Sequence, residues 1–379
     1  MLSYRQRFIE WNLRRRWGFS RQEMQLWGIS AQTPEKAREY VSIRAYKALR
    51  WYIEDLAWHP LVDNKWISKH YFSAQGIAMP ETYGLLHPQY GRTLGGDPLL
   101  SAEHLFHWLD ATGMDSLVMK HIGELKGQAV YIVERVLRNA RGQAEALVLL
   151  NGETLDGAAV QGLLGMERLG LRGFLLEQRV RLHPQMAALT AGGVASIRIN
   201  TLCCRDQAQV QLAYIRLGRA GALTDHGVRG GVNAPVDIAT GELGQGVVFA
   251  ADGVPHVCVQ HPDSQQWVAG QRVPDWAQCQ ALALEAARCC TGIPCVGWDV
   301  VPSAQGPLLI EGNVSWSMVV YQGVCGGLLA NGVAAGWRDH LGADLPDGSL
   351  RWRIKHWNKA RKLSVWEQVV SRIGRRWLG

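Results

Sequence analysis

The stretch that most constrains the fold of this chain is a predicted β-hairpin that ends in polar residues. Its strands are the apolar, β-prone runs Val296–Val301 and Pro307–Glu311, and residues 303–306 between them spell Ser-Ala-Gln-Gly, a turn signal. The run Leu308-Leu309-Ile310 is too apolar for a strand with one face in water. We therefore expect other elements to cover this hairpin.

The polar residues of the hairpin predict a metal site. If the turn centres on Gln305, Asp299 and Glu311 lie directly opposite each other, and Asn313 falls on the same face by strand alternation. Two facing carboxylates repel unless a cation separates them. Two carboxylates and an amide oxygen form a hard, all-oxygen set that suits Mg²⁺ bound together with substrate phosphates. The alternative is a solvated hairpin rim.

The composition is that of a soluble globular protein. Of the 379 residues, 47% are hydrophobic and 19% are charged. A chain of this length allows two or three subdomains. No uninterrupted apolar run reaches the ~18 residues of a membrane-spanning helix, and the basic N-terminus lacks the apolar region of a signal peptide. The eight cysteines show no CxxC motif and no zinc-type spacing. We expect a cytoplasmic protein with reduced cysteines.

Positive charge gathers at the two ends of the chain, interleaved with tryptophan. Between Arg351 and Gly379 there are nine basic residues and one acid, Glu367, so this tail carries nine minus one, or +8, in a chain with a net charge of +7. Such segments suit either an anionic membrane surface at the inner face or helices that dock on the protein through tryptophan. We expect no nucleic-acid partner, and we divide the chain into an N-terminal helical basic segment (1–60), a core (61–345) and a basic Trp-rich tail (346–379).

The order of predicted elements mixes helices with antiparallel hairpins, which indicates the α+β class. Thr33–Trp58 is predicted to be one helix, because a capping Thr33 precedes proline and the apolar residues broadly follow the helical period. Lys65–Gln75 is predicted to be a second helix, ended by Gly76. Glycine content predicts a loop over Gly218–Ala234, and a glycine-rich stretch followed by a helix over Val319–Leu341.

Several short motifs then follow one another in a fixed order. They are Asp63-Asn64-Lys65 at a helix start, Lys120 at a strand end before a glycine turn, Glu177-Gln178-Arg179-Val180, Ser196-Ile197-Arg198, and Gly297-Trp298-Asp299 with Glu311-Gly312-Asn313. From about residue 63 to about residue 331, this set resembles the ATP-grasp superfamily, and most closely its sugar-transfer-associated group, which is related to the α-L-glutamate ligases. The resemblance implies two α+β subdomains that close on ATP, with a nucleotide-binding lid over about 112–180, and extra helical segments at both ends.

The resemblance also implies a role for each matched residue. The residues that would bind ATP are Lys65 and Lys120 at the phosphates, Gly123, Lys126 and Gly127 in a loop over them, Glu177, Gln178 and Val180 at the adenine, and His183 at the ribose. The catalytic residues would be Lys120 and Arg198, the latter at the γ-phosphate or the acyl phosphate. The Mg²⁺ ligands would be Asp299, Glu311 and Asn313, and a substrate loop would contain Arg229, Gly231 and Asn233.

The residues alone leave some of these roles open. Lys65 and His183 also fit exposed positions, Arg198 also fits a salt bridge within its sheet, and residues 121–128 also fit an ordinary hairpin turn.

The function implied by the resemblance is an ATP-dependent carboxylate–amine ligase that forms an amide through an acylphosphate, with ATP and Mg²⁺ as cofactors. Its partners would be a small carboxylate and an amine or glycan acceptor, in the modification of a glycan or an amino-acid-derived metabolite. One alternative is a phosphotransferase that delivers the phosphoryl group to a hydroxyl. Another is a non-catalytic nucleotide-binding scaffold, against which the intact metal triad argues.

Overall fold

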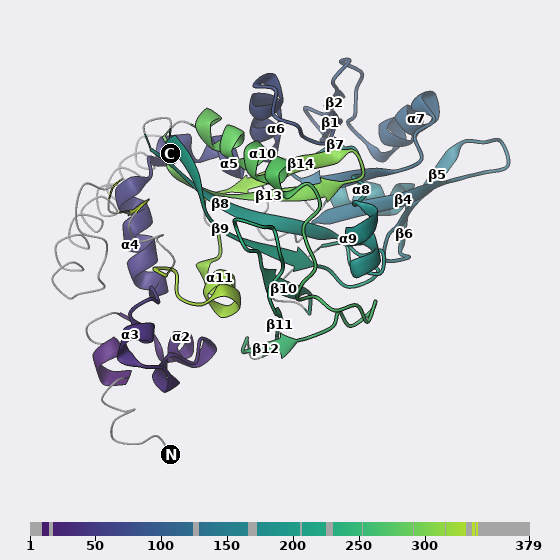
Figure 1. The fold of residues 1–379 in the computed structure, drawn as a ribbon. Helices are drawn as coiled ribbons and strands as arrows, with labels where there is room; N and C mark the ends of the chain where they lie inside the picture. Colours follow the sequence, from purple (N-terminus) through teal and green to yellow (C-terminus); the bar gives the residue numbers. More distant parts are fainter. Residues whose placement is uncertain are drawn as a thin grey trace.

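The α+β class predicted from the sequence is confirmed by the computed structural model. The structure describes residues 10–14, 18–123, 129–165, 173–204, 207–224, 230–251, 253–290, 292–314, 316–330, 336, 337 and 339. Within these residues the chain forms two seven-stranded sheets in which all neighbouring strands are antiparallel, with helices packed against them (Figure 1). None of the described helices is long and apolar enough to cross a membrane.

The smaller half of the protein is built on the first sheet, here called sheet A. Its strands, in spatial order, are β2 (Arg92–Thr93), β1 (Thr82–Leu86), β7 (Phe174–Glu177), β3 (Leu117–His121), β4 (Val130–Arg138), β5 (Ala144–Leu149) and β6 (Thr154–Asp156). Helices α7 (Ala102–Thr112) and α8 (Gly157–Gly165) bury residues such as Leu105 and Val160 against it. Sheet A therefore contains β1 and β2, which precede the lid range of 112–180 that we predicted.

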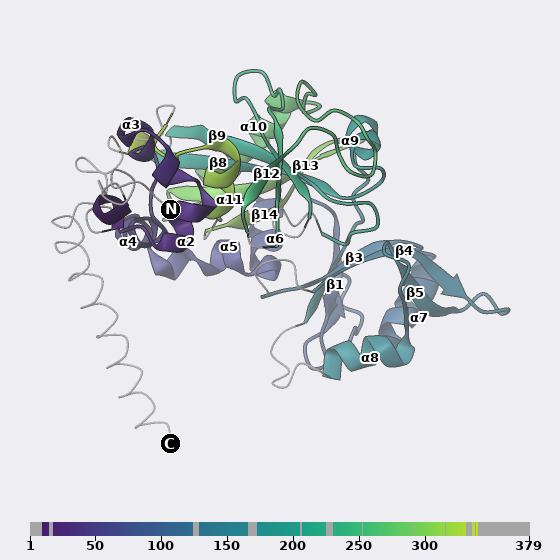
Figure 2. The same cartoon turned by 90° about the horizontal axis from the view of Figure 1, so that it is seen from below.

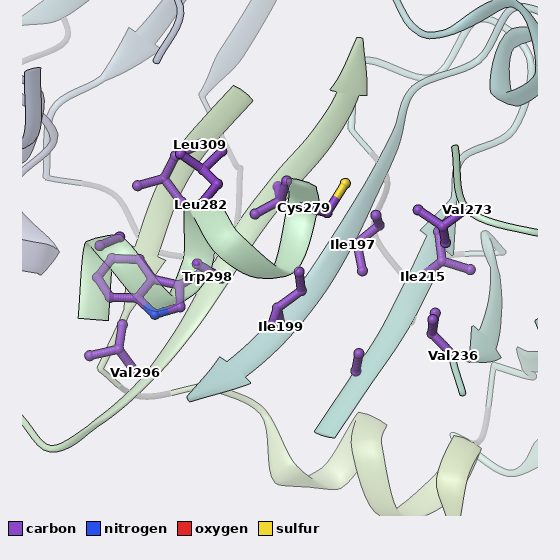
Figure 3. Packing of buried hydrophobic residues seen from close by; sticks show 14 of the residues in the cluster. Ile197, Ile199, Ile215, Val236, Val273, Cys279, Leu282, Val296, Trp298 and Leu309 are labelled. Carbon is purple, nitrogen blue, oxygen red and sulfur yellow. The ribbon is translucent and has the colours of Figure 1, made fainter. Parts of the chain in front are cut away.

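The larger half is built on sheet B. Its strands, in spatial order, are β12 (Pro255–Cys258), β11 (Gly246–Phe249), β10 (Val232–Pro235), β9 (Gln207–Leu217), β8 (Ala195–Cys204), β13 (Cys295–Ser303) and β14 (Gly306–Asn313). Helix α10 (Trp276–Cys289) covers one face, where Ile197, Ile199 and Trp298 pack against its buried side (Figure 3). Because side chains alternate along a strand, Arg198 and Asp299 point to the opposite face.

The N-terminal helices and α11 (Met318–Cys325) pack together on that opposite face of sheet B. The N-terminal elements are α2 (Arg21–Leu26), η2 (Ile29–Ala31), α3 (Pro34–Ala37) and α4 (Ile43–Ile53). They lie beside α11 and sheet B (Figure 2) and form one apolar cluster with them, which includes Trp27 and Tyr214. In this cluster the rings of Tyr46 and Trp316 make an edge contact, with centroids 5.2 Å apart. The Trp27 indole also donates to the carbonyl oxygen of Val319 at 3.2 Å. The N-terminal segment is thus part of the hydrophobic core.

Short helices join the two halves. The chain passes from α4 through η3 (Leu56–Trp58) and α5 (Pro60–Asp63) into α6 (Lys65–Ala74), and α9 (Pro184–Leu189) follows the linker that leaves sheet A. Helix α5 packs against β14, where a Cβ atom on Gly312 would lie 2.7 Å from the Val62 side chain.

Three sequence expectations about elements were wrong. Thr33–Trp58 is broken into α3, α4 and η3, because the backbone of Val41 exchanges two hydrogen bonds with the Gln322 side chain and Ser42 caps a new helix. The expected loop over Gly218–Ala234 ends in β10, which pairs with β9. In the stretch 319–341 the helix α11 comes first and Gly326 and Gly327 follow it, whereas the described residues 336, 337 and 339 are helical as expected.

The central hairpin contains the predicted pair of Asp299 and Glu311, but its turn and its register differ from the prediction. Asp299 is the partner of Glu311, yet Ser303 pairs with Gly306, so the turn consists of the two residues Ala304 and Gln305. A register shift just beyond Asp299 leaves Ile310 as an extra residue in β14. This bulge allows Leu309 to pack under α10 while Glu311, two residues later, shares the opposite face with Asp299.

Candidate active site

A buried carboxylate held by two lysines lies at the end of sheet A. Glu177 is the last residue of β7 and lies between β1 and β3, and its side chain is only 2% exposed. Lys120 of β3 contacts Glu177 Oε1, and Lys69 of α6 lies 2.7 Å from Glu177 Oε2. Lys69 also donates to the carbonyl oxygen of Pro80 at 3.2 Å.

The charges of this cluster depend on one another. Burial disfavours the ionised carboxylate, but Lys120 and Lys69 outweigh it and hold the pKa of Glu177 below its ordinary value. Burial also acts against the charge of Lys120, yet Glu177, with smaller contributions from Glu311 and Asp299, raises the pKa of Lys120. For Lys69 burial prevails, and its pKa is lowered. The influence of Glu311 and Asp299 on Lys120 links this cluster to sheet B.

On sheet B, Asp299 is buried between two arginines. Arg198 of β8 approaches it with two nitrogens, Nε to Oδ1 at 2.5 Å and Nη2 to Oδ2 at 3.1 Å. Arg216 of β9 lies 2.8 Å from Oδ2. Burial favours the neutral acid, but Arg198 and Arg216 prevail and lower the pKa of Asp299 to about 2. The salt bridge that we considered as the alternative for Arg198 is therefore present in the structure.

Glu311 and Asn313 lie beside Asp299 on the same face of sheet B. The Asn313 amide is 3.5 Å from Asp299 Oδ2 and 3.5 Å from Glu311 Oε1, so it lies between the two carboxylates. Lys65 Nζ lies 3.5 Å from Glu311 Oε2. The structure thus brings Asp299, Glu311 and Asn313 together, and it shows that basic side chains offset the repulsion between the two carboxylates.

Helix α6 provides a lysine to each of the two clusters. Asn64 caps its first turn by accepting hydrogen bonds from the backbone of Trp66 and Ile67. Lys65 and Lys69 are four residues apart and so lie on one side of the helix. The first reaches Glu311 of sheet B and the second reaches Glu177 of sheet A.

Taken together, the two clusters form a positively charged site between the halves. Five cationic side chains (Lys65, Lys69, Lys120, Arg198 and Arg216) face three carboxylates (Glu177, Asp299 and Glu311), a sum of five minus three, or +2. A site of this kind is suited to a polyphosphate, because phosphate groups need fixed cations and Mg²⁺ commonly arrives with them.

Three further residues that are predicted to bind the nucleotide follow β7, namely Gln178, Val180 and His183. The Gln178 backbone donates to the carbonyl oxygen of Glu81 at 2.8 Å, and its side chain accepts from the Glu81 backbone. Val180 is half-buried in the linker after β7. His183 caps α9, where its Nδ1 accepts from the Gln185 backbone at 3.3 Å. That contact gives His183 a structural role, and its contact with a ribose stays a prediction.

The predicted glycine loop and substrate loop are described only in part. Gly123, whose backbone donates to His121 Nδ1 at 3.4 Å, is the last described residue before a gap. Lys126, Gly127 and Arg229 lie outside the described residues. Gly231 and Asn233 of the predicted substrate loop are buried at the start of β10. Asn233 is paired in register with Arg216, which contacts Asp299.

Two residues of the site were missed by the sequence analysis. Lys69 follows Lys65 by four residues, on the face of α6 that buries Ser68 and Phe72, so helical spacing was the signal for it. Arg216 stands between the core residues Ile215 and Leu217, which is the pattern that singled out Arg198 between Ile197 and Ile199.

Comparison with known proteins agrees with this arrangement of motifs. Residues 49–333 match the family model described as sugar-transfer associated ATP-grasp, which is about three quarters of the chain. No curated protein matches the chain.

Several solved structures show distant similarity. A RimK domain protein ATP-grasp from Sphaerobacter thermophilus is 14% identical, with 72% of this chain and 68% of that chain covered and a TM-score of 0.36. The D-alanine-D-alanine ligase from Coxiella burnetii is 12% identical, with 84% and 68% covered and a TM-score of 0.39. N5-carboxyaminoimidazole synthase from Aspergillus clavatus is 12% identical, with 82% and 61% covered and a TM-score of 0.39. Scores this low leave the family assignment to the family model.

Proposed function

Because the chain belongs to the sugar-transfer associated ATP-grasp family, we propose that it is an ATP-dependent carboxylate–amine ligase that forms an amide bond through an acylphosphate. The observation that carries this proposal is the convergence of Asp299, Glu311 and Asn313 on one face of sheet B, next to Lys65. Glu311 and Asp299 also contribute to the raised pKa of Lys120. These groups offer phosphate binding and charge neutralisation, which are what phosphoryl transfer chiefly needs.

The oxygen atoms of this set fit Mg²⁺ that arrives with the nucleotide. Asp299 Oδ2 and Glu311 Oε1 lie on either side of the Asn313 amide, and a half-turn of that amide would present its oxygen to the same point. The two arginines already neutralise Asp299, so the site is poorly suited to a free cation. When bound, Mg²⁺ would offset the charge of the phosphates.

The residues of the chain would then serve the two steps as follows. In the first, a substrate carboxylate oxygen attacks the γ-phosphorus, the bond to the ADP oxygen breaks, and Lys65 and Lys120 hold the phosphates in line. In the second, an amine nitrogen attacks the acyl carbon, the bond to the phosphate oxygen breaks, phosphate leaves and the amine loses a proton. Arg198 and Arg216 would lie where the negative charge of the acyl phosphate is held.

The family name points to the class of acceptor. We propose that the amine belongs to an amino sugar or to an amino-acid-derived metabolite, consistent with a place in glycan modification. The basic tail over 346–379 would hold the enzyme at an anionic membrane, where lipid-linked acceptors are found.

The test is to supply MgATP with a panel of small carboxylic acids, with and without amines, and to measure ADP and phosphate. Hydroxylamine would intercept the acyl phosphate as a hydroxamate. We expect hydroxamate to form with one class of acid, and free phosphate to match the ADP formed. A phosphoester without free phosphate would instead favour the phosphotransferase reading, and ATP binding with no turnover across the panel would favour the scaffold.

The same assay tests the metal ligands through the variant Glu311→Gln, which keeps the shape of the side chain and removes its charge. We expect ATP turnover to fall by roughly two orders of magnitude or more, the effect of losing about 3 kcal/mol of transition-state stabilisation. The melting temperature should stay close to that of the wild type, because Glu311 is partly exposed and the substitution removes only its 3.5 Å ion pair with Lys65. Turnover near the wild-type rate would contradict the assignment of the metal ligands.

A further inference from the structure

We propose that Lys69 is a positioning residue: it holds the buried Glu177 carboxylate so that Lys120 can leave Glu177 and bind the nucleotide phosphates. The inference rests on the proposed function only in requiring MgATP at the site, and it concerns nucleotide binding rather than amide formation.

The geometry gives each oxygen of Glu177 its own lysine. Lys120 contacts Oε1, and Lys69 Nζ lies 2.7 Å from Oε2. The two lysines differ in their surroundings: Lys69 is 3% exposed and Lys120 is 12% exposed. Lys69 is fixed further by its hydrogen bond to the carbonyl oxygen of Pro80. Lys120 is therefore the lysine of this pair that is better placed to meet a ligand.

Electrostatics explains why a second lysine matters. A carboxylate as buried as Glu177 cannot be left without a cation, because the cost of an unpaired buried charge is severe. If Lys120 were its sole partner, moving Lys120 to a phosphate would strand Glu177. Since Lys69 remains in contact with Oε2, Glu177 keeps a partner when Lys120 moves.

Acidic side chains of sheet B lie near the resting position of Lys120. Glu311 and Asp299 both contribute to the raised pKa of Lys120, so the two carboxylates of the predicted metal site lie within electrostatic reach of its ammonium group. Glu177 then acts as the resting partner of Lys120 while the site is empty. Lys69 sets the affinity for nucleotide without touching the nucleotide.

The competing explanation is that Lys69 only neutralises Glu177 and supports the fold. In that case removing Lys69 would lower stability, but the folded protein would bind MgATP as before. The two explanations therefore differ in a binding constant, and they differ again in the response to a second substitution that removes the charge of Glu177.

The experiment measures the dissociation constant of MgATP by calorimetry for the full-length wild type, Lys69→Met, Glu177→Gln and the double variant Lys69→Met/Glu177→Gln. We expect Lys69→Met to bind about tenfold more weakly or worse, because Lys120 must stay with Glu177. Because Glu177 is also predicted to lie at the adenine, the double variant is compared with Glu177→Gln. These two should bind MgATP equally, since a neutral amide does not retain Lys120. Lys36→Met is the matched control: Lys36 pairs with Glu39 on the surface, with 58% of its side chain exposed, and its loss should leave the constant unchanged.

Each result decides the matter. Wild-type affinity in Lys69→Met, or a loss from Lys69→Met that is as large in the Glu177→Gln background as in the wild type, overturns the inference. If Lys69→Met does not fold, Lys69→Gln, which retains a donor for Pro80, is measured in its place with the same expectation. Wild-type protein that binds MgATP but yields no hydroxamate overturns the ligase proposal alone, whereas no MgATP binding by the wild type overturns both.

Discussion

At the scale of single residues, the buried Asp299 shows how charge compensation shapes this site. Its carboxylate is held by Arg198 and Arg216 from two neighbouring strands. We expect Asp299→Asn to destabilise the protein by about 3–5 kcal/mol, because it deprives the buried Arg198 and the half-buried Arg216 of the carboxylate that both contact. Urea unfolding checks this, with Glu242→Gln as the control: Glu242 pairs with Arg272 on the surface, so its loss should cost no more than about 1 kcal/mol. Equal effects would contradict the assigned role.

The stabilisation by Asp299 should depend on pH in a known direction. Its pKa is lowered from 3.8 to about 2 in the folded protein. A carboxylate with a lowered folded pKa stabilises the fold fully above its unfolded pKa, and that contribution is lost as the pH falls through the folded pKa. The difference in unfolding free energy between wild type and Asp299→Asn should therefore narrow as the pH falls from about 4 to about 2. A difference that stays constant over this range would argue against the ion pairs.

Residue types and their spacing predicted part of the site, and cross-strand pairing supplied the rest. Asp299, Glu311 and Asn313 could be grouped from the sequence because they belong to one hairpin and a local turn sets their register. Arg216 could not be grouped with Asp299, because that contact depends on β9, β8 and β13 lying side by side across about 80 residues of chain. The cations beside the carboxylates also removed the repulsion on which the metal argument had rested.

At the scale of elements, the bulge in β14 decides which side chains reach the site. Strict alternation would place Leu309 and Glu311 on the same face, and one of them would then be misplaced. The extra residue Ile310 places Leu309 in the core and Glu311 at the site. Nothing in the sequence here predicts the bulge. The predicted turn was off by half a residue, and the bulge shifts the register back, so that Asp299 still pairs with Glu311 as predicted.

Gly312 is the element-scale position that should tolerate substitution least. A Cβ atom there would lie 2.7 Å from Val62 and 2.8 Å from Trp298, so β14 would have to move and carry Glu311 and Asn313 with it. We expect Gly312→Ala to cost about 1–3 kcal/mol and most of the ATP turnover. Gly162→Ala in α8 is the control, since nothing lies within 4 Å of its Cβ position and alanine favours a helix. Wild-type stability and turnover in Gly312→Ala would show that the packing is looser than described.

The break between α3 and α4 could not be predicted from the local sequence, because a contact with a distant part of the chain causes it. The helical pattern runs through residues 33–58, but Val41 gives its backbone hydrogen bonds to Gln322, 281 residues later in the chain. A tertiary contact that replaces helical hydrogen bonds overrides local propensity.

At the scale of the whole molecule, the N-terminal helices belong to the structural core although the family match begins at residue 49. Trp27 is 5% exposed in the cluster that joins these helices to sheet B, whereas Trp267 is 61% exposed. We expect Trp27→Ala to lower the free energy of unfolding by about 3–5 kcal/mol, and Trp267→Ala to change it by less than about 0.5 kcal/mol. Chemical denaturation measures both. A Trp27→Ala protein as stable as the wild type would mean that the N-terminal segment is an independent appendage.

Helix α6 has a consequence for motion between the two halves. Its two lysines, about 6 Å apart along the helix axis, hold a carboxylate of sheet A and a carboxylate of sheet B. A rigid helix cannot follow both sheets if they move apart, so any opening breaks at least one of these ion pairs. Dissolved salt screens such pairs more strongly once they meet water. The balance between open and closed forms should therefore respond to ionic strength, and nucleotide entry with it.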